Sequence, residues 1–182
     1  MFRCRKTIPD PQADLLRKHY LNPNQNANSI LYAILLLLHS LFRWLVLASL
    51  LVSIGTAYQG FSGRKLFTAT ANKIRHWTAT IAHIQLILGA CLYFESPIVK
   101  LVSPDTGSGW AQDQPFFFRY IHAGMMIIAI IVITIGSAKS KRMKTDQQKY
   151  QTMFRFFLAA LVILLLAIPW PFSPFVARPY FR

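Results

Sequence analysis

Five ionisable residues lie inside long apolar runs of this 182-residue chain, where charged and titratable side chains are costly. They are three histidines and two arginines: His39, Arg43, His83, Arg119 and His122. Neutral imidazole binds transition metals, and two imidazoles that face each other can hold a haem iron from both sides. Guanidinium groups pair with carboxylates, which include haem propionates. These residue types therefore predict a metal or haem site in apolar surroundings, provided that the fold brings them together.

The composition is typical of a membrane protein rather than a soluble domain. The chain is 54% hydrophobic and still carries a formal charge of +14. Long runs without charge alternate with basic clusters, so the charges are separated from the apolar segments. A nucleic-acid-binding protein would need a basic stripe on a soluble fold, whereas these clusters lie at the ends of apolar runs. We therefore expect membrane lipid, and no nucleic acid, as a partner.

The apolar runs predict an all-α membrane protein, a bundle of four transmembrane helices with up-down-up-down topology. The transmembrane domain is predicted to cover residues 30–172, between a polar N-terminal tail at 1–29 and a short C-terminal tail at 173–182. The four predicted spans are residues 30–57, 74–94, 116–138 and 154–170.

The distribution of basic residues predicts the orientation of the bundle. The first and third connections are rich in Lys and Arg, and the first is expected to continue through Arg75. The second connection instead holds Glu95, Asp105 and Asp113. Because basic loops stay in the cytoplasm, both termini are predicted to be periplasmic, in a bacterial inner membrane. The basic residues at the start of the N-terminal tail argue the other way, but they lie more than about 20 residues from the first span, where the rule weakens.

This topology places three histidines in one layer of the bundle. At 1.5 Å per residue, His39, His122 and His83 lie roughly 13, 10 and 16 Å below the outer surface. The first and third helices of such a bundle are diagonal neighbours, so His39 and His122 are predicted to be the axial ligands of haem b. His83 is an alternative ligand or a proton acceptor at a quinol site. Arg119 is expected to meet a propionate, and Arg43, which lies deeper, the other propionate, a bound ligand or backbone carbonyls.

Other metal chemistries find less support in the residues. The predicted spans contain no Asp or Glu, which disfavours a di-iron or di-manganese carboxylate site. A His₃ zinc or copper site would also lack the carboxylates that usually orient its histidine ligands. Met125 and Met126 offer thioethers to copper, although methionine on a helix is more often core filler. Cys4 and Cys91 form no metal motif, and no CxxCH sequence for covalent haem is present. A single intramembrane histidine can also serve only in helix packing, so the prediction depends on several histidines at one depth.

Six segments of the chain carry a resemblance to a known family: His39–Trp44 (HSLFRW), His83–Gly89 (HIQLILG), Leu92–Tyr93, His122–Met126 (HAGMM), Ser137–Arg142 (SAKSKR) and Ile168–Pro171 (IPWP). Together they resemble a family of small bacterial four-span membrane proteins labelled "cytochrome B". The resemblance covers about residues 31–172. The N-terminal tail of this chain is longer than the short N-terminal segment expected for the family. The resemblance implies a b-type haem and electron transfer.

We therefore expect a membrane-embedded b-type cytochrome, or a haem-binding subunit of a respiratory assembly. It would pass electrons between quinol and an unidentified partner subunit, and not act as a stand-alone enzyme. The alternative is a cofactor-free accessory subunit of a larger membrane complex, whose polar residues only join helices or bind lipid. A transporter of metal or haem is a third hypothesis, but the chain has no internal repeat that would provide alternating access.

Overall fold

The computed structural model describes residues 23–100 and 114–170, and over these ranges the chain is helical without strands. Residues 1–22 of the predicted N-terminal tail, most of the loop with Asp105 and Asp113, and the C-terminal tail lie outside the described residues. The elements are α2 (Pro23–Ser62), α3 (Ala69–Glu95), the short α4 (Pro97–Lys100) and α5 (Gln114–Phe116), the π-helix η1 (Phe117–His122), α6 (Ala123–Arg142) and α7 (Asp146–Ala167).

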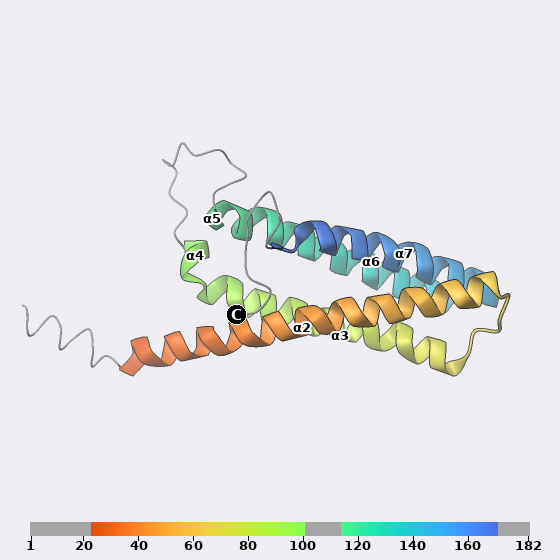
Figure 1. The fold of residues 1–182 in the computed structure, drawn as a ribbon, viewed down its shortest axis with the longest axis horizontal. Coiled ribbons are helices and arrows are strands. Elements are labelled where there is room, and N and C mark those ends of the chain that lie inside the picture. Colours follow the sequence, from red (N-terminus) through yellow and green to blue (C-terminus); the bar gives the residue numbers. More distant parts are fainter. Residues whose placement is uncertain (1–22, 101–113, 171–182) are drawn as a thin grey trace, which may run out of the picture.

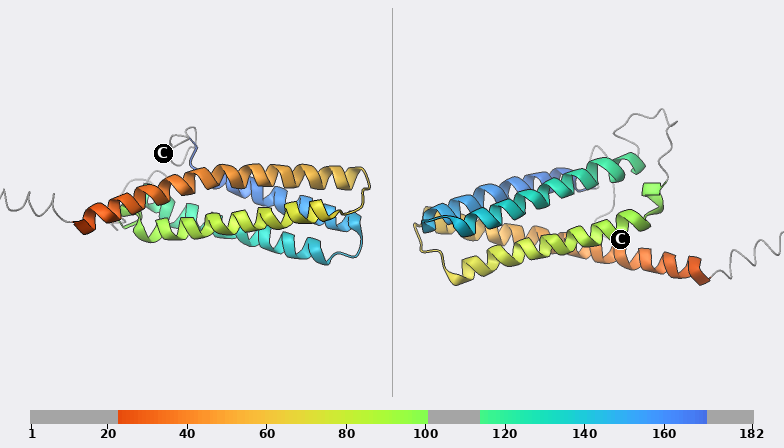
Figure 2. Two further views of the ribbon diagram at one scale, coloured as in Figure 1. Left: turned by 90° about the horizontal axis from the view of Figure 1, so that it is seen from below. Right: turned by 180° about the vertical axis from the view of Figure 1, so that it is seen from behind.

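Four long helices form an antiparallel bundle, which confirms the predicted fold class (Figures 1 and 2). Helix α2 packs mainly against α3 and α7, and α6 packs mainly against the same two helices, so α2 and α6 are diagonal. The α2–α3 and α6–α7 connections lie at one end of the bundle, and α4 and α5 lie at the other (Figure 1). All four helices are long and apolar enough to cross a membrane, so the chain is a multi-pass membrane protein. The four spans are Asn28–Ser62, Ala69–Glu95, Phe117–Arg142 and Asp146–Ala167.

The end with the short connections is held together by buried polar contacts between helices. Arg75, which the sequence placed in a loop, belongs to α3 and is only 5% exposed. Its guanidinium donates to the carbonyl oxygen of Ser137 on α6 at 2.8 Å, to the Ser137 hydroxyl, and to Asn72 Oδ1 at 2.9 Å. The hydroxyls of Ser53 and Thr78 join α2 to α3 at 2.6 Å. These hydrogen bonds satisfy the buried polar side chains of Arg75, Ser53 and Thr78 within the bundle, as is usual where helices pack in a membrane.

Three of the four long helices begin earlier than predicted, and α3 starts at Ala69 rather than near residue 74. Helix α7 starts at Asp146 rather than near residue 154, because Thr145 and Gln148 form a capping box in which the Thr145 hydroxyl accepts from the Gln148 N–H at 3.2 Å. Helix α2 starts at Pro23, inside the predicted tail, with the proline in the first helical turn where its missing N–H costs nothing. The apolar stretch that crosses the membrane is therefore shorter than the helix that carries it.

The third span opens with an irregularity that the sequence did not predict. Residues Phe117–His122 form a π-helix, in which each turn is wider than in an α-helix, before α6 continues from Ala123. Short π-helical segments inside α-helices are frequently found at functional sites. This one carries two of the predicted site residues, Arg119 and His122.

Candidate functional site

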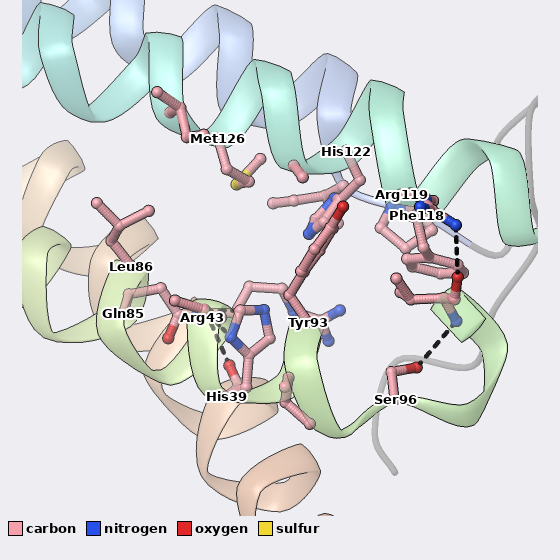
Figure 3. A pocket seen from close by; sticks show the side chains of 18 of the residues that line it. His39, Arg43, Gln85, Leu86, Tyr93, Ser96, Phe118, Arg119, His122 and Met126 are labelled. Carbon is pink, nitrogen blue, oxygen red and sulfur yellow. Dashed lines mark hydrogen bonds between the residues drawn. The ribbon is translucent and has the colours of Figure 1, made fainter.

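A cavity of about 550 Å³ lies between α2, α3 and the η1–α6 helix, toward the end that carries α4 and α5. Most of the side chains around it are apolar, and Phe118, Met126 and Tyr93 are among those drawn in Figure 3. Four of the five predicted site residues line it. The polar side chains among the lining residues are Tyr32, His39, Ser40, Arg43, Gln85, Tyr93, Ser96, Arg119, Tyr120 and His122.

The structure brings His39 and His122 together across the diagonal of the bundle. Their ring centres are 6.4 Å apart and the ring planes are inclined at 69° (Figure 3). His39 comes from α2 and His122 from the end of η1, two segments that make no extensive helix–helix contact of their own. The space between these segments therefore belongs to the cavity, and the two imidazoles reach into it from opposite sides.

His122 is oriented by the end of α7. Its Nδ1 lies 2.9 Å from the carbonyl oxygen of Ala167, and because a carbonyl can only accept, Nδ1 carries the proton. The other ring nitrogen, Nε2, is then unprotonated and able to bind a metal. The ring centres of Phe117 and Phe118 lie 6.1 and 5.8 Å from the centre of the His122 imidazole, and these rings restrict its rotation.

His39 rests against two residues of α3 that are one turn apart. The Gln85 Nε2 atom lies 3.0 Å from the His39 carbonyl oxygen, and 3.2 and 3.3 Å from the two ring nitrogens. Gly89 leaves room for the ring, because a Cβ there would lie 3.2 Å from His39 Cε1. Neither Gln85 nor Gly89 was among the site residues predicted from the sequence. Their spacing of four residues, which puts both on one face of a helix, was the available signal.

Two guanidinium groups give the cavity a positive charge. Arg43 and Arg119 line it from α2 and η1, and no Asp or Glu is found among its described lining residues. Arg119 Nη1 lies 3.5 Å from the carbonyl oxygen of Val99, which joins η1 to α4. A cavity with apolar walls and two cations is suited to a ligand that has an apolar body and anionic groups.

His83, the third predicted histidine, does not line the cavity. Its side chain is exposed on the outside of the bundle. Its Nδ1 lies 2.6 Å from the Ala79 carbonyl oxygen and its Nε2 lies 3.2 Å from Thr134 Oγ1. Over the described ranges no three His, Cys, Asp or Glu residues gather closely enough to hold a metal ion together, so the predicted three-histidine layer contains a pair instead.

The fold and the cavity together define a four-helix membrane protein with a cationic, histidine-lined internal site. Comparisons with protein-family models, with curated proteins and with solved structures found no match.

Proposed function

We propose that this chain binds haem b between His39 and His122 and transfers electrons in a bacterial inner membrane. The observation that carries the proposal is the separation of 6.4 Å between the two imidazole rings in an apolar cavity. Two bonds of about 2 Å from one metal ion to two facing imidazoles place the ring centres roughly 6 Å apart. The orientation of His122 by a backbone carbonyl is the arrangement usual for a metal-binding histidine.

The other residues of the cavity fit the same group. A volume of about 550 Å³ falls within the usual range of cofactor pockets, and the apolar lining suits a macrocycle. Two glycines widen the space, since Gly89 accommodates the His39 ring and a Cβ at Gly124 would meet nothing within 4 Å. Arg43 and Arg119 would hold the propionates, whose charges have no acidic side chain to repel them in the described lining.

Haem b, when bound, supplies one-electron redox chemistry. The chain itself contributes two neutral imidazoles as ligands, an apolar lining that limits access of water, and two cations. Because two histidines, His39 and His122, would hold the iron, the site is suited to electron transfer rather than to binding a small gas. We propose quinol as the electron donor and a further subunit of a respiratory assembly as the partner, in agreement with the resemblance to the "cytochrome B" family.

The first prediction concerns the absorption spectrum. The chain expressed in a bacterial membrane and purified in detergent should show a dithionite-reduced b-type spectrum with stoichiometric haem. His39→Ala and His122→Ala should each remove this spectrum, because one imidazole alone loses the paired ligation. His76→Ala is the control, since His76 is exposed near the end with the short connections and should leave the spectrum unchanged.

Two results would contradict the proposal in different ways. A purified wild-type chain that folds but takes up no haem, even when haemin is supplied, would favour a cofactor-free accessory subunit. A haem that survives His39→Ala but is lost in His83→Ala would keep the function and transfer the ligand role to His83.

A further inference from the structure

A second hollow lies at the end of the bundle with the short connections, between the start of α3, the end of α6 and the start of α7. Its volume is about 280 Å³, and none of its described lining residues belongs to the histidine cavity or is acidic. The residues that line this lysine hollow are Phe67, Thr68, Ala69, Asn72, Lys141 and Lys149.

Two cations from different helices line the lysine hollow. Lys141 lies in the last turn of α6 and Lys149 in the first turn of α7. Lys149 Nζ donates to Asp146 Oδ1 at 3.0 Å, in a partly exposed ion pair of the kind that contributes little to stability. An ammonium group has three N–H donors, so Lys149 can bind a second anion beside Asp146.

Asn72 brings an oriented amide to the same place. Arg75 Nε and Nη2 donate to Asn72 Oδ1 at 3.2 and 2.9 Å, and Arg75 is itself held by the Ser137 carbonyl oxygen at 2.8 Å. Because a guanidinium group can only donate, the amide atom that faces it is the oxygen. The amide nitrogen of Asn72, with its two N–H donors, therefore points away from Arg75.

Hydrogen bonds between helices hold the walls of the lysine hollow in place. The buried Ser140 hydroxyl on α6 donates to the Lys149 carbonyl oxygen on α7 at 2.9 Å. The hydroxyl of Tyr150 donates to the Leu66 carbonyl oxygen in the α2–α3 connection at 3.0 Å. A site whose walls are already ordered loses less conformational entropy when a ligand binds.

The lysine hollow lies at the depth of the lipid headgroups. Trp77, which is 60% exposed, follows Asn72 on α3 by about 7.5 Å along the helix axis. Exposed tryptophans are enriched at the membrane–water interface, so Asn72 lies on the watery side of that level. The exposed apolar side chains of α6, among them Ile131 and Ile135, lie deeper and face acyl chains.

We propose that the lysine hollow binds the headgroup phosphate of an anionic phospholipid from the surrounding membrane. Basic pockets between transmembrane helices bind such headgroups. Lys141 and Lys149 offset the charge of the phosphate, and Asn72 donates a hydrogen bond to it. A lipid bound there contacts α3, α6 and α7 at once. This inference goes beyond the proposed function and does not depend on haem.

The test measures lipid binding to the full chain, purified in detergent, by native mass spectrometry. The wild type should bind one dioleoyl phosphatidylglycerol per chain, about 10-fold more tightly than dioleoyl phosphatidylcholine. Lys141→Gln and Lys149→Gln should each weaken phosphatidylglycerol binding about fivefold, through the loss of one basic residue near the membrane surface. Lys144→Gln is the matched control, since Lys144 is an exposed lysine of the α6–α7 connection that does not line the lysine hollow.

Asn72→Asp provides a second variant that keeps the fold. It retains the oxygen that accepts from Arg75 and replaces the donating amide nitrogen with a second carboxylate oxygen. Thermal unfolding should therefore stay unchanged, while the preference for phosphatidylglycerol should be lost. Gln59→Glu puts the same charge on the exposed surface of α2 near this end and should keep the preference.

Each outcome bears on the lipid site and not on the haem proposal, which is tested by absorbance. Loss of the preference in the three variants of the lysine hollow, with its retention in Lys144→Gln and Gln59→Glu, would support the site. Equal binding of both lipids by the wild type would overturn it, and so would equal losses in the variants and the controls. Displacement of phosphatidylglycerol by inorganic phosphate would overturn the lipid assignment and make the hollow a site for free phosphate.

Discussion

The charge of the cavity is decided by two residues. Arg43 and Arg119 bring guanidinium groups to the wall of an apolar cavity. Guanidinium groups form strong, charge-assisted hydrogen bonds with carboxylates, and these are stronger in apolar surroundings than in water. The ligand is therefore expected to bring negative charge into the cavity, as the propionates of haem b would.

The second prediction tests that charge. Arg119→Gln should weaken haemin binding by about 10-fold or more, because a hydrogen bond to a charged group contributes about 1.5–3 kcal/mol. Haemin dimethyl ester, which carries no propionate charge, should bind the wild type and Arg119→Gln with similar affinity. The affinities can be measured by titration of the apoprotein followed by absorbance. An equal loss for both ligands would show that Arg119 acts on the fold and not on the ligand's charge.

At the scale of the elements, the closeness of α6 and α7 depends on a glycine. A Cβ at Gly136 would overlap the Phe156 side chain of α7, whereas at Gly55, on α2, it would meet open space. Small residues at such positions let transmembrane helices approach closely, and dispersion contacts then stabilise the pair. Helix α7 must lie close to α6, because the carbonyl of Ala167 at its end orients His122.

The third prediction follows from this contact. Gly136→Ala should lower the free energy of unfolding by about 1–3 kcal/mol through overpacking. Gly55→Ala should leave it unchanged or raise it by up to about 1 kcal/mol, since alanine favours the helix. Denaturant or thermal unfolding in detergent, followed by circular dichroism, measures both. Equal effects of the two substitutions would contradict the close α6–α7 contact.

At the scale of the whole molecule, the two ends of the bundle differ. The end with the short connections is joined by the hydrogen bonds of Arg75 and by the Ser53–Thr78 pair. The other end contains the cavity, and its helices diverge toward α4 and α5 (Figure 1). The basic connections 63–68 and 143–145 lie together at the first end (Figure 1), so the positive-inside rule can be applied to that end as a unit.

The fourth prediction concerns orientation. In a variant without native cysteines, a single cysteine at position 62 or 144 should not react with a membrane-impermeant maleimide in intact bacterial cells. Both should react after the membrane is permeabilised, because Ser62 and Lys144 are exposed. Labelling of both positions in intact cells would invert the proposed topology and place the termini in the cytoplasm.

The sequence by itself was sufficient to predict the architecture. Uncharged apolar runs of about 20 residues predict membrane helices without knowledge of their neighbours, and short connections make consecutive helices antiparallel. The diagonal relation of the first and third helices followed, and the structure brings His39 and His122 together across it. Their role as haem ligands stays a prediction.

The tertiary structure decided which way each helix face points. The sequence gives the positions along an apolar helix, but when apolar residues surround the helix, no periodicity reveals its rotation about its own axis. His83 therefore looked equivalent to the other histidines, yet it lies on the outside of the bundle, while Gln85, two residues later, lines the cavity. Arg75 was predicted to lie in a loop, whereas in the structure it belongs to α3 and donates a hydrogen bond to Ser137 on α6. The wider turns of η1, which carry Arg119 and His122, likewise have no signal in the pattern of apolar residues.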